Sequence, residues 1–315
     1  MAMRVFHFNS NGDAVDVGLK MRIENEGHRV DNAAPNPDCI IAENKEIKSD
    51  TPTFGGGSWA CSINRSSDYA TTVLKTLGIK NEKVNNGIRI TIEAWYNGKS
   101  IQGVNYSMTD YPLMEGGKGP VTSGMGSVVW EGRADSRLFK ATLGKLEGAL
   151  EKVDYRGVIH MDLLVGDRQL LVHSIHAGIN WNTFPVLAEM YHGRINDLLY
   201  GIASGVDKPM KFKSVIGVGV MLKMYMPRPP VKIEGLNKHN LKHFWMDDPE
   251  CINTGRLGVV TARGDEIQGF SALRDAKRRV MRTIYNLTIP EVMFRQDVGN
   301  KVEKNRAQLK TWGWL

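Results

Sequence analysis

The sequence predicts an α/β (α+β) protein in which a small parallel sheet is followed by longer hairpin strands. Strand-like residues 4–8 and 38–42 flank a helical pattern at 15–25. This is the order of a parallel β–α–β unit. Two later turns, at Asn97-Gly98 and Gly166-Asp167, separate segments that alternate between apolar and polar residues. Such turns are typical of β-hairpins.

The other elements are predicted from periodicity and from glycine and proline positions. A glycine loop at 54–58 precedes a helix at 66–77, which has an apolar stripe and ends at Gly78. We expect strands at 89–96, 101–108, 157–165, 169–175, 214–226 and 256–262, and helices at 138–153, 186–202 and 271–286. The proline-marked stretch 227–249 is expected to be a long loop.

Composition limits the classes of protein that the chain can represent. Its 315 residues carry a net charge of +7, which favours phosphorylated molecules, nucleic acid or acidic membranes, or simply serves solubility. Cys39, Cys61 and Cys251 lack C-x-x-C spacing, so we expect buried free thiols and neither disulfides nor a zinc ribbon. No signal peptide or run of ~18 apolar residues is present, so the expected location is the cytoplasm, without a membrane partner.

The glycine-dense segment, residues 115–127, is the most informative local feature. Its glycines exclude a helix or a regular strand in our interpretation, and successive amides can form an anion-binding nest. Lys118 and Thr122 could add a charge and a hydroxyl. The alternative is a flexible surface hairpin.

A second segment, residues 294–299, contains an arginine and an aspartate after a basic helix. Arg295 could clamp a phosphate or carboxylate. The alternative is an Arg295–Asp297 pair that ties down the C-terminal tail. Arg274, Arg278 and Arg282 on the preceding helix could also contact nucleic acid, although such a face is more often solvated surface.

Several motifs in this order together resemble phosphoribosylamine–glycine ligase (glycinamide ribonucleotide synthetase), of the ATP-grasp superfamily. Residues 118–127, K-G-P-V-T-S-G-M-G-S, resemble the family's D-x-G-P-N-T-G-G-M-G-A-Y. Residues 92–98, I-E-A-W-Y-N-G, resemble its hinge I-E-E-F-L-D-G, and 294–299, F-R-Q-D-V-G, resemble (Y/F)-R-x-D-I-G. Residues 155–159 resemble its Y-x-G-x-L strand. The likeness covers most of the chain.

The resemblance implies an ATP-grasp-like fold with domains at 1–58, 59–207 and 208–315, the middle one reduced. It also implies that ATP and magnesium drive the coupling of glycine or another amino acid to the amine of a phosphorylated small molecule, through an acyl phosphate. The implied catalytic residues are Arg295, Asp297 and Thr122. The implied substrate-binding residues are Lys118, Gly119, Pro120, Thr122, Ser123, Gly124, Met125 and Gly126. Glu93, Ala94, Trp95 and Tyr96 would meet the adenine through backbone groups.

The sequence departs from the family at the ATP site. Only a short polar linker separates Ile79 from Arg89, where the family has the lid that covers the phosphates. Position by position, the magnesium-binding glutamate and asparagine of the family fall on His173 and Ile175. Asp162 is a candidate for a substitute metal ligand, the alternative being an ordinary surface residue of its strand. A site built from His173 and His176 is disfavoured.

Four functions therefore remain open. The first is an ATP-dependent ligase close to the family activity. The second is a reduced ligase that acts on another amine, such as a modified base or nucleotide. The third is a non-catalytic phosphate-binding protein, and the fourth is direct binding of nucleic acid. Arg89, Lys99 and Lys118 are the basic residues nearest to the site that could contact phosphate in the first two cases.

Overall fold

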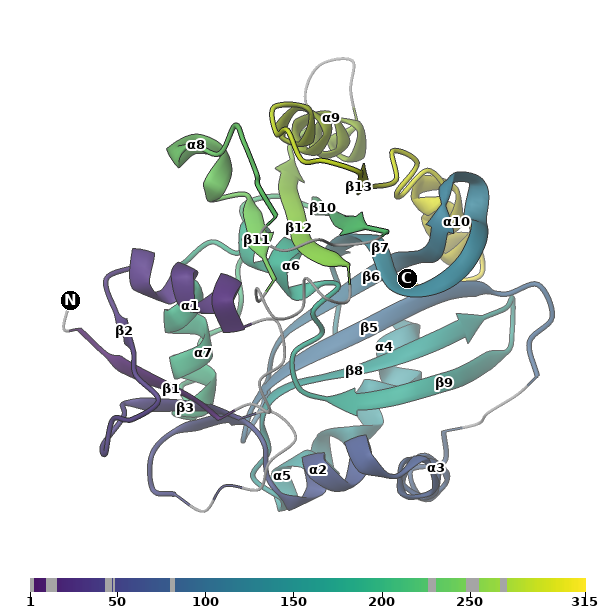
Figure 1. The fold of residues 1–315 in the computed structure, drawn as a ribbon. Coiled ribbons are helices and arrows are strands. Elements are labelled where there is room, and N and C mark those ends of the chain that lie inside the picture. Colours follow the sequence, from purple (N-terminus) through teal and green to yellow (C-terminus); the bar gives the residue numbers. More distant parts are fainter. Residues whose placement is uncertain are drawn as a thin grey trace.

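The computed structural model describes residues 3–9, 16–42, 47, 49–79, 83–225, 231–247, 255–266 and 271–315. Within these residues the chain forms two sheets (Figure 1). A four-stranded parallel sheet has the order β2-β1-β3-β4, and a nine-stranded sheet has the order β11-β12-β10-β7-β6-β5-β8-β9, with β13 paired to β10. The mixed α/β fold class is thus as predicted.

The small sheet comes from the N-terminal β–α–β unit. It contains β1 (Val5–Asn9), β2 (Arg29–Val30), β3 (Cys39–Ala42) and β4 (Thr53–Gly55), all parallel, with α1 (Asp16–Asn25) between the first two. Phe6, Leu19 and Ile23 are fully buried where α1 packs on the sheet. Cys39 and Cys61 are buried and form no disulfide, as expected, and Cys251 lies outside the described residues.

The large sheet is antiparallel throughout. Its strands are β5 (Ile88–Asn97), β6 (Ile101–Met114), β7 (Lys118–Glu131), β8 (Arg156–Val165), β9 (Leu170–Ala177), β10 (Ile216–Met224), β11 (Phe244–Met246), β12 (Arg256–Gly264) and β13 (Val292–Met293). Both predicted hairpins are confirmed, as β5–β6 and β8–β9. Because β10 pairs with β7, the predicted boundary at 207/208 falls between strands of one continuous sheet.

The predicted irregular conformation of the glycine-dense segment is wrong. Only its tip, Glu115–Gly117, is a 3₁₀ turn, and β7 begins directly afterwards and pairs with β6. The glycines make room for neighbouring chain segments. A Cβ on Gly126 would lie 2.6 Å from the Gly219 carbonyl oxygen, and one on Gly124 would lie 2.5 Å from Oδ1 of Asn182.

The helices are shorter than predicted. They are α2 (Ser58–Arg65), α3 (Ser67–Thr76), α4 (Arg137–Ala141), α5 (Glu147–Lys152), α6 (Phe184–Met190), α7 (Ile195–Ala203), α8 (Lys238–Leu241), α9 (Ala272–Tyr285) and α10 (Val302–Thr311). The predicted helix at 138–153 breaks at Thr142, whose hydroxyl donates back to the Leu138 carbonyl. The one at 186–202 breaks at Tyr191, which is extended and bridges to Phe212. The expected loop at 227–249 contains α8 and β11.

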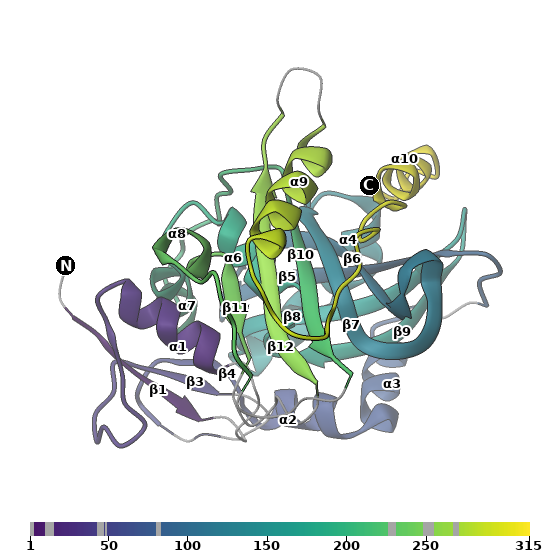
Figure 2. The ribbon, with the colours of Figure 1, turned by 45° about the horizontal axis from the view of Figure 1, so that its top comes forward.

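The helices cover the faces of the large sheet unequally. Helix α4 lies behind β5 and β8 in Figure 1. Leu138, Leu146 and Leu150 of the α4–α5 region belong to one buried cluster with Ile159 and Met161 of β8. A second core joins α6 and α7 to the small sheet, and α9 lies across β10 and β12 (Figure 2). The opposite face of β5 and β8 packs against α7 at one end, where Trp95 and Val158 join the second core. Beyond that contact the face of β5, β8 and β9 carries no helix in Figure 1, and the candidate site lies there; we call this part the helix-free face. No helix in the described ranges has the length and hydropathy needed to cross a membrane.

Candidate functional site

Polar side chains alternate with core residues on β5, β8 and β9. Ile90, Ile92, Ile159 and Met161 face the buried core. The alternate positions place six polar side chains on the helix-free face, because successive strand residues point to opposite faces. We call them the sheet-face cluster: Thr91, Glu93, His160, Asp162, Ser174 and His176. Their pairing across three strands brings together residues that are far apart in the sequence.

Glu93 is the most buried member of the sheet-face cluster. Its carboxylate accepts hydrogen bonds from Nδ2 of Asn105 (2.8 Å), from Nδ2 of Asn180 (2.9 Å) and from the Thr183 hydroxyl. Burial raises the pKa of the Glu93 carboxyl to about 7, although these three hydrogen bonds oppose the shift. Nε1 of Trp95 in turn donates to Oδ1 of Asn105 (3.1 Å). The carboxylate therefore organises a buried polar network.

The loop after β9 connects this network to the glycine-dense segment. Asn180 binds Glu93, and Nδ2 of Asn182 donates to the Ser123 carbonyl oxygen (2.8 Å). The absence of a side chain at Gly124 leaves space for Asn182. Loop residues 178–183 thus connect the strand that contains Glu93 with the glycine-dense segment, two segments that the sequence predicted separately as parts of a site. This loop was not predicted from the sequence to belong to a site, although its asparagines shortly precede a helix with Pro185 in the first turn.

Asp162 and a pair of histidines form the open part of the cluster. Oδ1 of Asp162 accepts from the Thr91 hydroxyl (2.5 Å), and Oδ2 accepts from the Ser174 hydroxyl (3.0 Å). The rings of His160 and His176 lie 5.2 Å apart between centroids. Burial, together with the nearby His176, lowers the pKa of His160 to about 4, so its imidazole is neutral near pH 7. His176 is exposed.

A β-bulge decides which residues of β9 face Asp162. His176 pairs with His160 and Ser174 pairs with Asp162, but the next pair joins Leu163 to Val172. His173 is the extra residue, and Ile175 points into the core on the other face. Of the two positions that fall on the family's metal ligands, Ile175 is therefore turned away from Asp162, and the correspondence itself stays a prediction. Ser174 and His176 lie on the same face as Asp162 instead, because the bulge shifts the register.

The donor set does not fit a dedicated magnesium site. Asp162 supplies the one carboxylate of the open part, and both of its oxygens already accept hydrogen bonds from hydroxyls. Its neighbours His160 and His176 offer nitrogen, whereas Mg²⁺ prefers oxygen ligands in octahedral geometry. Among the residues described, no group of three or more His, Cys, Asp or Glu side chains could hold a metal ion.

The four hinge residues that were predicted to meet adenine lie in the middle of the large sheet. From Glu93 to Tyr96, β5 pairs with β6 on one side and with β8 on the other. Trp95 and Tyr96 are fully buried, on opposite faces of the strand, and Ala94 faces the core. The backbone groups of this stretch are therefore engaged in the ladders, and a role in nucleotide binding stays a prediction.

The predicted substrate-binding residues divide into two groups along β7. Lys118, Gly119 and Pro120 are exposed near the hairpin tip, and Ser123 is also exposed. Gly124, Met125 and Gly126 are buried where β7 meets β10 and the loop at 178–183. The Thr122 hydroxyl donates to the Tyr111 carbonyl oxygen (2.7 Å) and accepts from the Gly124 amide (3.1 Å). These contacts fix the hairpin, and binding of substrate by this strand stays a prediction.

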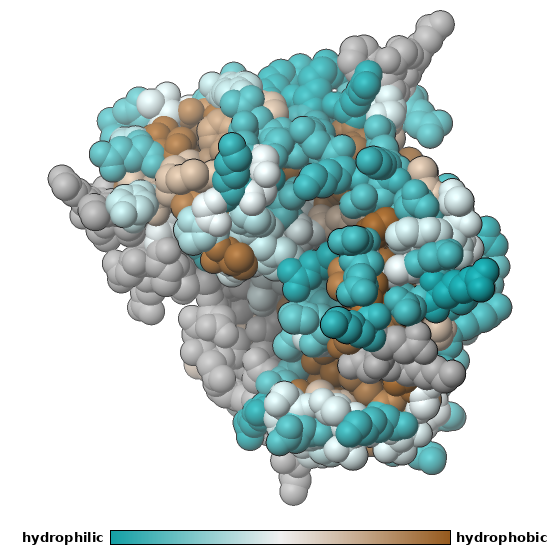
Figure 3. Space-filling model, turned by 90° about the vertical axis from the view of Figure 1, so that its right-hand side faces the viewer, coloured by the Kyte–Doolittle hydropathy of each residue, from teal (hydrophilic) through white to brown (hydrophobic). Residues whose placement is uncertain are grey.

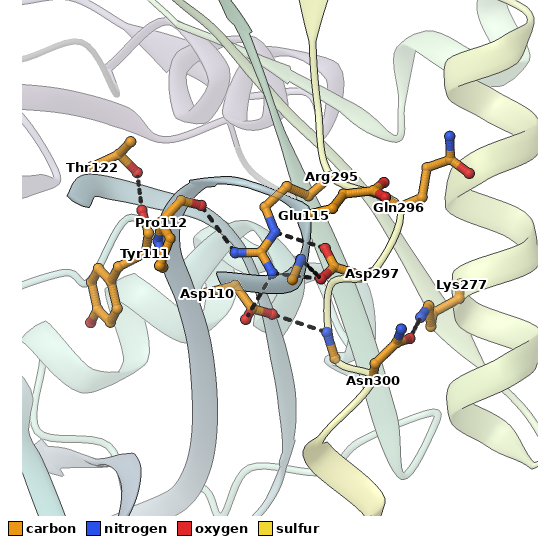
Figure 4. Close-up of polar contacts among 12 residues, drawn as sticks. Asp110, Tyr111, Pro112, Glu115, Thr122, Lys277, Arg295, Gln296, Asp297 and Asn300 are labelled. Carbon is orange, nitrogen blue, oxygen red and sulfur yellow. Dashed lines mark hydrogen bonds and ion pairs between the residues drawn. The ribbon is translucent and has the colours of Figure 1, made fainter. Parts of the chain in front are cut away.

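Arg295 is buried and fastens the C-terminal segment to the β6–β7 hairpin (Figure 4). Its guanidinium makes two 2.8 Å bonds to the Asp297 carboxylate and one of 3.0 Å to the Pro112 carbonyl oxygen. Asp110 lies 3.4 Å away. Asp297 also accepts from the Gly116 amide at the hairpin tip (2.8 Å). This is the arrangement of a pair that ties down the C-terminal tail, the alternative that the sequence left open.

Thr122 and Arg295 therefore meet the same strand. They bind the neighbouring carbonyl groups of Tyr111 and Pro112 on β6, as Figure 4 shows. The structure brings these two predicted catalytic residues to one hairpin. The donors of Arg295 are already occupied by protein acceptors, however, so a ligand would have to displace one of them. Their catalytic role stays a prediction.

The glycine loop at 54–58 lines a separate groove of about 540 Å³. Gly55, Gly56 and Gly57 all have positive φ, between 70° and 87°, and α2 begins at Ser58. Successive residues of this kind can direct amide groups toward an anion. Elsewhere, on the right-hand side of Figure 1, hydrophilic side chains cover most of the surface, and hydrophobic ones are seen in a central recess and in smaller patches toward the left of the view (Figure 3).

Comparisons with known proteins show the fold. No protein-family model matches the chain, and no curated protein sequence matches it. Among solved structures, phosphoribosylamine–glycine ligase from Thermotoga maritima aligns over 94% of this chain and all of its own, with a TM-score of 0.72 and 16% identity. The β-γ-ATP complex of biotin carboxylase from Campylobacter jejuni aligns over 98% and 97%, with a TM-score of 0.61 and 8% identity.

A third structure, phosphoribosylglycinamide synthetase from Anaerococcus prevotii, aligns over 91% of this chain and 99% of its own. Its TM-score is 0.54 and its identity is 9%. Together these matches confirm the predicted ATP-grasp-like fold. At such low identity they do not carry activity over to this chain, because one fold hosts many functions. Eleven residues, 77–87, join α3 to β5, where the family has its lid according to the sequence resemblance.

Proposed function

We propose that the chain is an ATP-dependent ligase that forms a carbon–nitrogen bond between an amino acid and the amine of a phosphorylated molecule. The observation that carries this proposal is the alignment of nearly the whole chain with phosphoribosylamine–glycine ligase. In this reaction the carboxylate of the amino acid takes the γ-phosphoryl group of ATP and releases ADP. The amine then attacks the acyl phosphate and displaces phosphate.

Two exposed residues of the helix-free face support the proposal. Arg89 precedes Thr91 and Glu93 on the same face of β5, and it lies over the Tyr111 ring at 4.9 Å from the centroid. A cation held in this way can contact a substrate phosphate. His176 is exposed beside Asp162 and can accept the proton that the attacking amine loses.

The test is release of ADP from purified protein with Mg-ATP, glycine or other amino acids, and phosphorylated amines. We expect acceptor-dependent ADP release that falls at least about a hundredfold in His176→Gln, the lower end of the roughly 10²–10⁴ range of general-base effects. His173→Gln, which alters the bulged histidine on the same strand, is the matched control. Absence of ADP release with every acceptor, or equal loss in both variants, would contradict the proposal.

A second candidate is a non-catalytic or repurposed protein that binds a phosphorylated ligand. The short connection of residues 77–87 and the poor fit to magnesium favour it, because transferred phosphoryl groups need neutralising charge and exclusion of water. Ligand-dependent melting distinguishes the two candidates. A shift with ribose phosphates but none with Mg-ATP supports the second, and at 100 times Kd the stabilisation is about 2.7 kcal/mol.

A further inference from the structure

Helix α9 has one apolar face and one strongly basic face. Ala272, Ala276, Val280 and Ile284 are buried toward β10 and β12. Arg278 and Arg282 lie on the other side and are exposed. A basic helix face can be ordinary solvated surface. The residues that surround this basic face decide whether it can bind a ligand.

The basic side of α9 borders a groove of about 630 Å³, which we call the basic groove. Its other walls come from α1, from the α8 region, from the end of β12 and from the segment before β10. Figure 2 shows α1, α8 and α9 placed around β11 and β12. Seven of the sixteen lining residues are arginine or lysine, and one, Glu189, is acidic. The basic groove thus contains seven of the 41 lysine and arginine residues of a chain whose net charge is +7.

Part of this positive charge is neutralised by the protein itself. Arg278 and Arg279 form ion pairs with Asp275 at 2.9 and 2.8 Å, and Glu189 binds His243 at 3.0 Å and approaches Arg22 at 3.7 Å. The remaining four cations have no carboxylate within ion-pair distance among the described residues: Lys213, Lys242, Arg263 and Arg282. Like charges in a shared hollow repel each other unless an anion is bound there.

The uncharged residues that line the basic groove indicate which class of anion would fit it. Five of them are asparagine or threonine, and the one aliphatic residue is Ala262. Sites for small organic molecules are mostly apolar. Arginine, lysine, asparagine and threonine are instead the residues that contact phosphate and sugar oxygens of nucleic acids. The basic groove therefore offers charge and hydrogen bonds, but little surface on which a base could be buried.

The groove also continues along α1. A neighbouring groove of about 400 Å³ shares Arg22 and Lys242 with it. Lys238 adds a further cation to this second groove, beside apolar side chains that include Phe244 and Trp245. The line of cations along the two grooves suits a chain of phosphates better than a single nucleotide. We propose that the basic groove binds the sugar–phosphate backbone of a nucleic-acid strand, without reading its bases. This inference does not depend on the ligase reaction proposed above.

The test is fluorescence anisotropy with a labelled single-stranded DNA longer than the roughly 16 nucleotides of a large site. We expect binding that weakens with salt, with a log–log slope of about −0.7 for each phosphate contacted. The double variant Lys213→Ala/Arg282→Ala should bind roughly tenfold more weakly and lose about 1.4 from the slope. Lys213→Arg/Arg282→Lys should restore binding because it restores the charge.

The matched control is Lys304→Ala/Lys310→Ala, which removes the same charge from exposed positions on α10. Melting temperatures confirm that each variant is folded. The proposal is overturned if DNA fails to bind at low salt, or if the control pair and the groove pair lose equal affinity. It is also overturned if free ATP or inorganic triphosphate competes at the same concentration of phosphate as the DNA, since the ligand is then a single nucleotide or polyphosphate.

Discussion

The sheet-face cluster and the basic groove use polar side chains in opposite ways. In the cluster, Glu93 accepts three hydrogen bonds, and both oxygens of Asp162 accept from hydroxyl groups. In the basic groove, four cations that include Lys213 and Arg282 have no carboxylate partner in the described structure. The first region satisfies its two carboxylates within the protein, although Nδ1 of His160 is buried there without a hydrogen-bond partner among the described residues, and the second region leaves positive charge available to a ligand.

This difference separates folding from binding. Removing one partner of a buried hydrogen bond destabilises the protein strongly, because the remaining group loses its partner and gains no water molecule in exchange. Exposed charges without partners contribute little to stability and are available to a ligand. We therefore expect substitutions in the cluster to act mainly on folding and substitutions in the groove to act mainly on binding. His176 is the exception, because it is an exposed member of the cluster.

The largest effect is expected for Glu93→Ala. This change leaves Asn105, Asn180 and Thr183 without their shared acceptor, and we expect it to lower the free energy of unfolding by about 3–5 kcal/mol. Chemical denaturation measures the loss. Glu131→Ala, at an exposed position on β7, should change stability by less than about 0.5 kcal/mol. Similar small losses in both variants would remove the contrast between the two regions.

The second effect is a pH dependence caused by the same carboxyl. Its pKa is about 7 in the folded protein against an ordinary value of 4.5. Between these values the folded state binds more protons than the unfolded state, so the free energy of unfolding falls as pH rises. Relative to Glu93→Gln, the free energy of unfolding of the wild type should fall by about 3 kcal/mol between pH 4.5 and 7, because each unit of pKa shift corresponds to 1.36 kcal/mol.

The comparison with Glu93→Gln is needed because His160 acts in the opposite direction. Its folded pKa of about 4 lies below the ordinary 6.5, so its contribution to stability is lost as pH falls through this range. Denaturation curves of both proteins at several pH values give the difference. A difference that stays constant from pH 4.5 to 7 would show that folding does not raise the pKa of Glu93.

The third effect concerns the contact between the C-terminal segment and the hairpin. Arg295→Ala removes bonds to Asp297 and to the Pro112 carbonyl, and we expect a loss of about 2–3 kcal/mol because the guanidinium is buried. Arg133→Ala breaks an exposed pair with Asp135 that is also short (2.6 Å), and it should destabilise the protein much less, because water screens the two charges. Equal losses in the two variants would mean that burial does not set the strength of these pairs.

The smallest effect on stability is expected in the basic groove. Lys213→Ala/Arg282→Ala should change the free energy of unfolding by less than about 0.5 kcal/mol, and relief of repulsion can make the change favourable. Added salt should stabilise wild type slightly more than this variant, because it screens the cations. If the variant instead lowers the free energy of unfolding by several kcal/mol, these side chains stabilise the fold and are not free for a ligand.

Much of the fold followed from local sequence patterns. The N-terminal β–α–β unit was predicted from strand and helix periodicity, and the β5–β6 and β8–β9 hairpins were predicted from Asn97-Gly98 and Gly166-Asp167. Two of the predicted helices were too long. The first ends at Thr142, whose hydroxyl donates to the Leu138 carbonyl, and the second ends at Tyr191, which pairs with the distant Phe212. Such contacts override helix propensity and are not visible in periodicity.

The sequence by itself determined the class of the protein, the order of most elements and the resemblance that the structural comparisons confirm. Tertiary structure alone decided which polar residues meet. A bulge at His173 turned Ser174 and His176 toward Asp162, and pairing of β7 with β10 converted a glycine-dense segment into a strand. Burial then enclosed Arg295 with Asp297. The physical reason is that side-chain facing, strand register and burial depend on partners far away in the chain, whereas turns and periodicity depend on neighbours.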